Sequence, residues 1–406
     1  MAKLMKNESR IDRLSGLPDS ILCHILSFLP TKYAVRSSVL STRWRYLSTL
    51  VHNLDFQGKN SHAFINFVDR VLFLHDAAVS IQKFHLNIYP DQRNLYENVC
   101  ARRICGWITY ALNRLVQQLD INMWLLGPIH NPATLFTSKT LVKLKLVVDF
   151  LVLTIPTKVW FPSLKIIFLE QVQFLDNDSV RRLISGCPVL EELVIYSDWN
   201  NVQELYISNS SLKTMTIGTN GNGFDGFDSE FVVSIVVVDA PSLVYFKLSG
   251  IPVKSFSFLN PMSLVKANYS YIYNDLGNRL VDKDIATNLL RVISNVQSLY
   301  FTDDILKVFS LCDKPLLVFH NLVHLEIGFN PGFYEFDGGL AELLESAPNL
   351  RTLIFRNDFS RVIWRPPTEV PCCLLFHLKV EPEIAQIAQK LLMLPRKSTM
   401  CQVEIV

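Results

Sequence analysis

Three cysteines in the sequence could supply a thiolate nucleophile for group-transfer chemistry. Cys187 lies in the segment "SGCPVL", and Cys372 and Cys373 are adjacent to each other. A thiol becomes reactive when a nearby positive charge lowers its pKa, and no His or Lys lies close to Cys187 in the sequence. Cys187 also precedes a predicted strand, where a small buried thiol packs well. We therefore interpret Cys187 as a structural residue and predict no catalytic residues.

Two pairs of residues have a spacing that could suit metal ligands. His320 and His324 are four residues apart, but they lie in "HNLVHLEIGF", which has a strand-like pattern. A strand rises about 3.3 Å per residue, so the two imidazoles would lie about 13 Å apart. Cys100 and Cys105 are five residues apart in a helix-like segment, which places them on different faces. We predict neither a metal site nor a cofactor.

Known catalytic and phosphate-binding motifs are absent from the sequence. It contains no G-x-S-x-G, no H-E-x-x-H and no pair of carboxylates whose spacing indicates acid and base roles. The glycine-rich segment Gly218 to Glu230 has neither G-x-G-x-x-G nor a following Gly-Lys-Ser/Thr, so we expect a plain loop. An enzyme of an unrecognised type would have no positive support in the sequence.

The composition narrows the class of protein. The 406 residues are 49% hydrophobic and 19% charged, and no uninterrupted apolar run is long enough to span a membrane. The sequence has 39 basic and 37 acidic residues, and Lys and Arg do not cluster among aromatic residues. Nucleic acid is therefore not an expected partner. The eight cysteines are scattered and no leader peptide is visible, which favours reduced thiols and a location in the nucleus or cytoplasm.

A repeated pattern, L-x-x-L-x-L with conservative apolar replacements, occupies the middle of the chain. The best copies are Leu141-Leu144-Leu146, Leu164-Ile167-Leu169, Leu190-Leu193-Ile195, Leu212-Met215-Ile217, Leu243-Phe246-Leu248, Leu322-Leu325-Ile327 and Leu350-Leu353-Phe355. Weaker copies are Ile81-Phe84-Leu86, Val116-Leu119-Ile121, Val202-Leu205-Ile207 and Val296-Leu299-Phe301. Most neighbours are about 20 to 30 residues apart, which is the period of leucine-rich repeats.

The period predicts an α/β solenoid. Each copy forms a short strand that buries its alternate residues, and one such unit cannot cover its own apolar face. Stacked units therefore form a parallel sheet on the concave side of an arc, with helices outside. Segments such as "DNDSVRRLISGCPVLEEL" have the period of these helices. The section Ser249 to Val281 matches no copy well, and we expect an irregular or looped-out unit there.

The N-terminal stretch Leu17 to Leu47 predicts three short helices with more apolar surface than they can hide. Pro18 suits the start of the first helix, Pro30 ends it, and Thr31 is a potential cap for the second. The apolar residues of the first helix span too wide an arc for one buried stripe. Either the repeats or a second protein must cover the other face.

The same stretch, "RLSGLPDSILCHILSFLPTKYAVRSSVLSTRWRYLSTLVHNLDF", resembles the F-box of plant F-box and leucine-rich-repeat proteins. The matching features are the pair Leu17-Pro18, "ILSFLPTK", "SVLS" and "RWR". The resemblance implies a three-helix module that docks on a Skp-type adaptor attached to a cullin. The implied adaptor-binding residues are Leu17, Pro18, Ile21, Ile25, Val39, Leu40 and Trp44, of which all but the first two could instead hold the helices together. Alternatively, the stretch only caps the solenoid.

The resemblance extends along the chain and divides it into three parts. "LFTSKTLVKLKL" and "FPSLKIIFLEQVQF" resemble the repeats of the family, whereas "WRPPTEVPCCLLFHLKV" and "LLMLPRKSTMCQVEIV" resemble the two ends of its F-box-associated (FBD) region. The helix-rich insert between these two ends is reduced to "EPEIAQIAQK". We predict an F-box at 10–55, a solenoid at 56–362 and a shortened FBD-like region at 363–406, which either folds as the family's domain or caps the arc.

The resemblance implies a non-catalytic substrate receptor of a Skp-cullin-F-box ubiquitin ligase, with a protein substrate held by the arc. From the alternation of strand side chains, the predicted substrate-binding residues are Lys143, Lys145, Lys165, Phe168, Glu191, Glu192, Lys213, Tyr245, Lys247, His324, Arg351 and Arg356. The alternative is a ligase-independent scaffold with the same F-box and repeats, which the shortened C-terminal region favours.

Overall fold

The computed structural model describes most of the N-terminal and central parts of the chain. The described residues are 14, 16–89, 101–123, 129–219, 233–250, 253–270, 283–302, 305–306, 309, 317–328, 339–356, 378–380 and 403–405. Cys100, Cys372 and Cys373 lie outside these ranges, as does the glycine-rich segment beyond Thr219.

The N-terminal helices are short because prolines and turns separate them. They are α1 (Asp19–Leu26), α2 (Thr31–Arg36), the 3-10 turn η1 (Ser37–Val39) and α3 (Trp44–Leu47). Pro18 and Pro30 occupy the cap positions of the first two helices. Thr31 does not cap α2. Its hydroxyl instead accepts a hydrogen bond of 2.7 Å from the backbone N–H of Asp55, so it joins the helices to the first strand.

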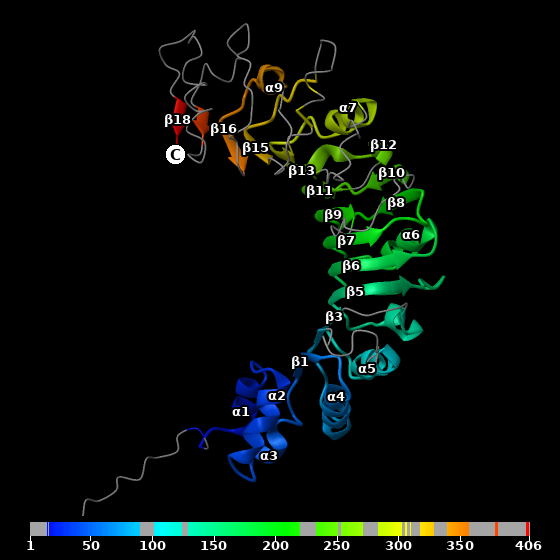
Figure 1. The fold of residues 1–406 in the computed structure, drawn as a ribbon, viewed down its shortest axis with the longest axis vertical. Helices are drawn as coiled ribbons and strands as arrows, with labels where there is room; N and C mark the ends of the chain where they lie inside the picture. The colour runs from blue at the N-terminus through cyan, green and yellow to red at the C-terminus, as the bar shows by residue number, and fades with distance from the viewer. Residues whose placement is uncertain are drawn as a thin grey trace, which may run out of the picture.

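One long parallel sheet forms the main part of the molecule and curves into an arc (Figure 1). Its strands, in chain order, are β1 (Asn53–Lys59), β2 (Lys83–Tyr89), β3 (Gln118–Met123), β4 (Ile129–His130), β5 (Lys143–Leu153), β6 (Ile166–Phe174), β7 (Glu192–Asp198), β9 (Thr214–Thr219), β11 (Tyr245–Ser249), β13 (Lys266–Ser270), β14 (Ser298–Thr302), β15 (His324–Gly328), β16 (Thr352–Arg356), β17 (Leu378–Val380) and β18 (Val403–Ile405). The last two strands extend the sheet from the predicted FBD-like region.

The strand register explains why the repeat pattern produces one core. The central leucine position of each copy aligns with the same position of the next, as in the pairs Leu144↔Ile167 and Ile167↔Leu193. All three side chains are at most 1% exposed. Each repeat therefore covers the apolar face of its neighbours, and the prediction of a leucine-rich-repeat solenoid is confirmed.

The outer side of the arc carries the helices and 3-10 turns that connect the strands (Figure 1). These are α4 (His62–Leu74), α5 (Ala101–Asn113), α6 (Asp178–Ser185), α7 (Lys283–Val292), α9 (Leu340–Ser346), η2 (Ala133–Thr137) and η3 (Pro261–Ser263). The face of the main sheet on the inner side of the arc, opposite these elements, is called the open face below.

Between α6 and α7 the outer layer is a second parallel sheet instead of helices. It contains β8 (Glu204–Ser208), β10 (Val233–Asp239) and β12 (Val253–Phe258), with β10 in the middle. The β-branched run "VSIVVVD" of β10 favours a strand over a helix. The weak copy Val202-Leu205-Ile207 belongs to this outer sheet, so its prediction as a repeat of the main sheet was wrong.

The prediction of an irregular unit at Ser249 to Val281 was also wrong for its described residues. Strand β13 continues the main sheet, and Leu264, Ala267 and Tyr269 occupy the three pattern positions with exposures of 7%, 1% and 6%. The repeat pattern was not recognised in the sequence because Ala267 is small and Tyr269 carries a hydroxyl group. Phe246, which pairs with Ala267 in the sheet, packs 5.2 Å from the ring of Phe256.

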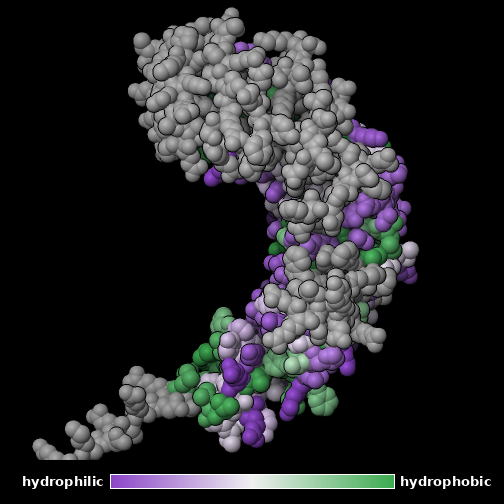
Figure 2. All heavy atoms as spheres, in the orientation of Figure 1, coloured by the Kyte–Doolittle hydropathy of each residue, from purple (hydrophilic) through white to green (hydrophobic). Residues whose placement is uncertain are grey.

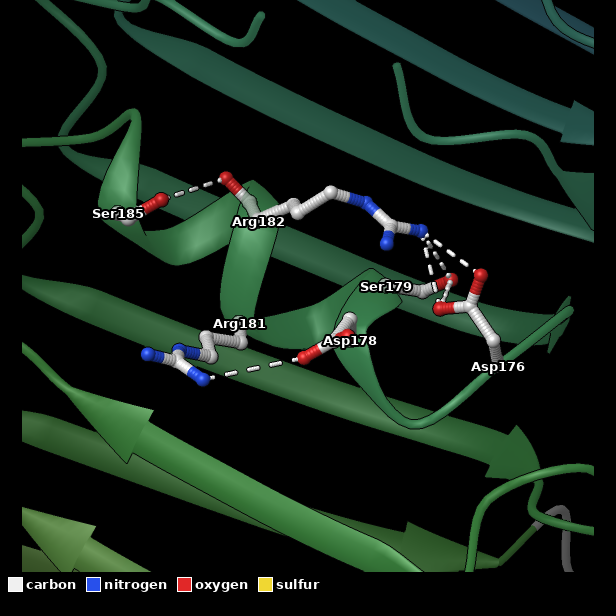
Figure 3. A network of polar contacts seen from close by, with 6 residues as sticks. All are labelled: Asp176, Asp178, Ser179, Arg181, Arg182 and Ser185. Atoms are coloured by element: carbon white, nitrogen blue, oxygen red, sulfur yellow. Dashed lines mark hydrogen bonds and ion pairs between the residues drawn. The ribbon is translucent and has the colours of Figure 1, made fainter. Parts of the chain in front are cut away.

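Helix α6 shows how an outer helix is fixed at its start (Figure 3). The side chain of Arg182 donates hydrogen bonds of 2.9 Å to both carboxylate oxygens of Asp176, and the hydroxyl of Ser179 donates one of 2.8 Å. Burial raises the pKa of Asp176, but these hydrogen bonds outweigh it and the net shift is downward. The charged carboxylate therefore ties the turn before α6 to the helix.

Candidate interaction surfaces

Helix α1 has two apolar faces, and only one of them is covered. Leu22 and Leu26 are 0% and 2% exposed and join the core, whereas Ile21 and Ile25 are 46% and 37% exposed. Each pair has a spacing of four residues, so each forms a stripe along the helix. The expected excess of apolar surface is therefore present, and the residues that the structure describes leave the second face open.

Other exposed apolar side chains lie in the same N-terminal helices and their turns. With Ile21 and Ile25, the group comprises Phe28 at 73%, Leu29 at 39%, Tyr33 at 53%, Val39 at 86%, Leu40 at 62% and Tyr46 at 65% exposure. Figure 2 shows hydrophobic residues gathered on this part of the molecule, whereas the inner side of the arc is mainly hydrophilic. We call these eight residues the N-terminal apolar surface.

The residues implied in adaptor binding fall into different environments. Ile21, Ile25, Val39 and Leu40 are exposed members of the N-terminal apolar surface, and Pro18 is exposed in front of α1. Leu17 is half-buried and packs against the core, and Trp44 is only 3% exposed.

Because Trp44 is buried, the structure favours a role in holding the helices together over a contact with the adaptor. Four members, Phe28, Leu29, Tyr33 and Tyr46, were not among the residues implied in adaptor binding. Their signal was available for the first two, which continue the spacing of Ile21 and Ile25 along the chain.

Two polar links hold the N-terminal helices to each other and to the arc. The Arg43 guanidinium lies 2.7 Å from a carboxylate oxygen of Asp19 and also donates a hydrogen bond to the carbonyl of Leu17. The hydrogen bond from Asp55 to the buried Thr31 joins helix α2 to β1. One face of the helices therefore caps the arc, and the opposite face points away from it.

On the open face near the N-terminal end of the arc, two pairs of opposite charge form between neighbouring strands. The Nδ1 atom of His85 lies 2.7 Å from Asp55, and the ammonium group of Lys145 lies 3.8 Å from Asp120. Burial raises the pKa of Asp55, but the hydrogen bonds from His85 and Gln57 lower it by a larger amount, so the net shift is downward.

Three predicted substrate-binding residues form a charged row at the edge where the strands begin. The carboxylate of Glu191 lies 2.9 Å from the ammonium of Lys165 and 2.7 Å from that of Lys213. The hydrogen bonds from Lys213 and Lys165 lower the pKa of Glu191 to about 2. The three side chains are brought together because each one precedes the strand of its own repeat.

The other predicted substrate-binding residues are spread along the arc. Lys143 and Lys145 lie on β5, Phe168 on β6, Glu192 on β7, and Tyr245 and Lys247 on β11. His324 is the first residue of β15, Arg351 lies just before β16, and Arg356 is the last residue of β16. The ammonium of Lys145 lies 5.4 Å from the ring centre of Phe168, and Arg356 pairs with Glu326 at 2.7 Å. They do not form one continuous site.

Aromatic rings hold two further lysines on the open face. The ammonium of Lys247 lies 6.0 Å from the ring centre of Tyr196, and that of Lys266 lies 5.8 Å from the ring centre of Tyr245. Lys266 and Tyr196 were not predicted. The signal for Lys266 was hidden because its repeat was not recognised, whereas Tyr196 was visible as an alternate residue of the predicted strand after Leu193.

Comparison with known proteins matches both parts of this architecture. Residues 14–55 match the model of the F-box domain, and residues 104–263 match the leucine-rich repeats of the FBD-associated F-box protein At5g56370. F-box/LRR-repeat protein At4g14096 of Arabidopsis thaliana is 34% identical over 395 residues, which cover 89% of this chain and 78% of that protein. The chain belongs to the plant F-box/leucine-rich-repeat family.

Other members of the family give the same result. F-box/LRR-repeat protein At3g59200 of Arabidopsis thaliana is 35% identical over 85% of this chain and 69% of its own length. For F-box/LRR-repeat protein At4g14103 of the same plant, identity is 33% over 87% of this chain and 94% of that protein. F-boxes and leucine-rich repeats are protein-interaction modules, so the chain has a role in protein–protein interaction.

The thiols of this F-box protein that the structure describes are poor nucleophiles. Burial raises the pKa of Cys187 to about 12, and its thiol donates a hydrogen bond of 3.2 Å to the carbonyl of Leu183. Burial also raises the pKa of Cys105, on α5. Within the described ranges, no group of His, Cys, Asp and Glu is arranged to hold a metal ion. The described helices include none that is both long and apolar enough to cross a membrane.

Proposed function

We propose that this chain is the substrate receptor of a Skp-cullin-F-box ubiquitin ligase and has no catalytic activity of its own. The observation that carries the proposal is the N-terminal apolar surface. Ile21 and Ile25 stay exposed on a module that matches the F-box, although the same helix has already covered its other face. An apolar surface of this kind is typical of a site that another protein covers. The proposed partner is a Skp-type adaptor and, through it, a cullin.

In this proposal the chain works by proximity. The F-box at 10–55 attaches the chain to the ligase, and the solenoid at 56–362 holds a protein substrate on its open face, with the FBD-like region at 363–406 at the far end. A substrate lysine then remains near the charged conjugating enzyme at a high effective concentration. The proposed location is the nucleus or the cytoplasm, where the ligase acts.

Co-expression with a Skp-type adaptor tests the first half of the proposal. Ile21→Ser with Ile25→Ser should abolish co-purification, because it places polar groups on the exposed stripe and leaves the buried stripe intact. Leu17→Ala is a weaker choice, since Leu17 packs against the core and its loss also affects folding.

The matched control is Val189→Ser with Val318→Ser, because these valines are 37% and 42% exposed, close to the values for Ile25 and Ile21. The control variant should still co-purify with the adaptor. A folded wild-type chain that fails to bind the adaptor would contradict the proposal.

A reconstituted ligase tests the second half. The complex of chain, adaptor and cullin should transfer ubiquitin to a protein that co-purifies with the arc. If the adaptor binds and no transfer occurs to any such protein, the chain is a ligase-independent scaffold, the alternative that a shortened C-terminal region favours.

A further inference from the structure

Four side chains on the middle of the open face form a cluster of two cations and two aromatic rings. They are Tyr196 on β7, Tyr245 and Lys247 on β11, and Lys266 on β13. Lys247 lies over the ring of Tyr196 and Lys266 over that of Tyr245, with ammonium-to-centre distances of 6.0 and 5.8 Å. We call this group the Tyr–Lys cluster.

The backbone between these strands is shaped to let the cluster form. Strand β9 separates β7 from β11, and Gly218 on β9 pairs with Tyr196 on one side and Ser249 on the other. A Cβ atom at Gly218 would lie only 2.5 Å from ring atoms of Tyr196. The ring therefore occupies the space of the missing side chain and lies across β9, within reach of Lys247.

The two lysines differ from the other lysines that the structure brings into ion pairs. Lys145 faces Asp120, and Lys165 and Lys213 share Glu191. Lys247 and Lys266 form no ion pair with any carboxylate of the described residues. A ring face holds an ammonium group in position without neutralising its charge.

Among the described residues, strands β9, β11, β13 and β14 carry no carboxylate on the open face. The open-face residues of β9, β11, β13 and β14 are Thr214, Thr216, Gly218, Tyr245, Lys247, Ser249, Lys266, Asn268, Ser270, Ser298, Tyr300 and Thr302. Glu192 and Asp198 lie on the same face of β7 as Tyr196, and Glu170 of β6 pairs with Tyr196 in the sheet. On the other side of the cluster, Glu326 is paired with Arg356. Burial and the nearby Tyr196 raise the pKa of Tyr245, whose hydroxyl remains a neutral donor at neutral pH.

We propose that the Tyr–Lys cluster binds an acidic segment of the partner protein, with Asp or Glu side chains paired to Lys247 and Lys266 and an apolar side chain against the tyrosine rings. The inference rests on the proposed receptor function and names the chemistry of its substrate. The two ammonium groups are already ordered by the rings, so binding costs less side-chain entropy than pairing with free lysines. A long polyanion fits less well, because Glu170, Glu192 and Asp198 lie beside the cluster and Asp120 lies further along the same face.

Fluorescence anisotropy of the full chain, purified with the adaptor where the two co-purify, tests this inference. The probe is a labelled peptide in which Glu and Asp alternate with Leu and Phe, and its twin carries Gln and Asn instead. The acidic peptide should bind at least about tenfold more tightly than the twin, and added salt should weaken it. Equal binding of the twin would contradict the role of the carboxylates.

Charge reversal locates the site. Lys247→Glu with Lys266→Glu should weaken the acidic peptide by at least about tenfold. The matched control, Lys59→Glu with Lys83→Glu, makes the same change in net charge on the same face at β1 and β2 and should have less than about a twofold effect. Equal losses in both variants would show only a general attraction and would overturn the proposal.

Tyrosine variants separate the role of the rings from that of net charge. Tyr196→Ala and Tyr245→Ala should each weaken the peptide by about threefold although no charge changes, because the ammonium groups lose their ordering. Tyr196→Phe and Tyr245→Phe keep the ring face and should bind like the wild type. Alanine variants that fold and bind normally would contradict the role of the rings.

Two further probes can also overturn the assignment. A phosphoserine peptide that binds where the Glu peptide does not would replace carboxylate by phosphate as the ligand. A single-stranded oligonucleotide that binds more tightly, with loss in the Lys247 and Lys266 variant, would assign the cluster to nucleic acid. Adaptor co-purification is measured on the same preparations, so failure of the peptide and failure of the receptor function are distinguished.

Discussion

Helix α1 and strand β7 differ in how completely their apolar side chains are buried. In α1, Ile21 and Ile25 remain 46% and 37% exposed beside the buried Leu22, whereas in β7 Leu193 and Ile195 are both fully buried. A repeat in the middle of the arc has a neighbour on each side that covers it. The N-terminal helices have such a neighbour on one side only. An apolar stripe is therefore a packing element inside the stack and an open surface at its end.

The largest loss of stability is expected for a side chain that is fully buried between two repeats. Leu193→Ala should lower the free energy of unfolding by about 3 kcal/mol, because it leaves a cavity between two repeats that cannot close. Urea denaturation followed by circular dichroism measures the change. A loss below about 1 kcal/mol would show that neighbouring repeats move to fill the space.

Neighbouring residues of α1 sharpen the comparison within one helix. Leu26→Ala should destabilise the protein by about 3 kcal/mol, while Ile25→Ala should cost only about 1 kcal/mol, because the side chain of Ile25 is 37% exposed and its loss leaves no closed cavity. The same denaturation experiment measures both variants. Equal losses would mean that the chain itself covers Ile25, and the N-terminal apolar surface would not be open.

The junction between the two regions depends on one buried hydrogen bond. Thr31→Val keeps the shape of the side chain but leaves the backbone N–H of Asp55 without this acceptor, which should cost about 1 to 2 kcal/mol. Faster amide hydrogen exchange at Asp55 should accompany the loss. As a control, Thr49→Val removes a hydroxyl that bonds only to the exposed carbonyl of Tyr46 and should have little effect.

The smallest effect is expected at the charged edge of the arc. The pKa of Glu191 is lowered from 4.5 to about 2, so its contribution to stability is present above pH 4.5 and is lost as the pH falls towards 2. Glu191→Gln should therefore lower the melting temperature slightly at pH 7 and not at pH 2. Thermal melts at both pH values measure this.

An NMR titration of the Glu191 carboxyl checks the cause of the shift directly. In the wild type it should titrate near pH 2. Lys213→Gln should move the midpoint upwards, towards the ordinary value, because Lys213 supplies the leading hydrogen bond. An unchanged midpoint would show that Lys213 does not hold the carboxylate in solution.

The sequence predicted the repeats well where leucine or isoleucine filled the pattern. It failed at Leu264-Ala267-Tyr269, where a small Ala stands in place of a large apolar residue. The large Phe246 lies next to Ala267 in the sheet, and this neighbour cannot be identified from the linear pattern. It also failed for β8, which was predicted as a repeat of the main sheet, because a strand in the outer layer has the same alternation as one in the main sheet. The pattern identifies a strand but does not say to which sheet it belongs.

The candidate sites were predicted less completely for a related reason. Alternation correctly placed Tyr245 and Lys247 on the open face, but it could not pair Lys247 with Tyr196 or Lys266 with Tyr245. Likewise, the wide apolar arc of α1 predicted two faces without saying which one the chain covers.

The sequence by itself therefore determined the kind of units, their period and the excess of apolar surface at the N-terminus, because these depend on side-chain types at fixed local spacing. Only the tertiary structure decided which stripe of α1 stays open and which lysines find carboxylates or rings. Strands that are far apart in sequence lie about 4.8 Å apart in the sheet, and their contacts depend on that stacking. Partners for Lys247 and Lys266 are thus set by neighbouring repeats and not by neighbouring residues.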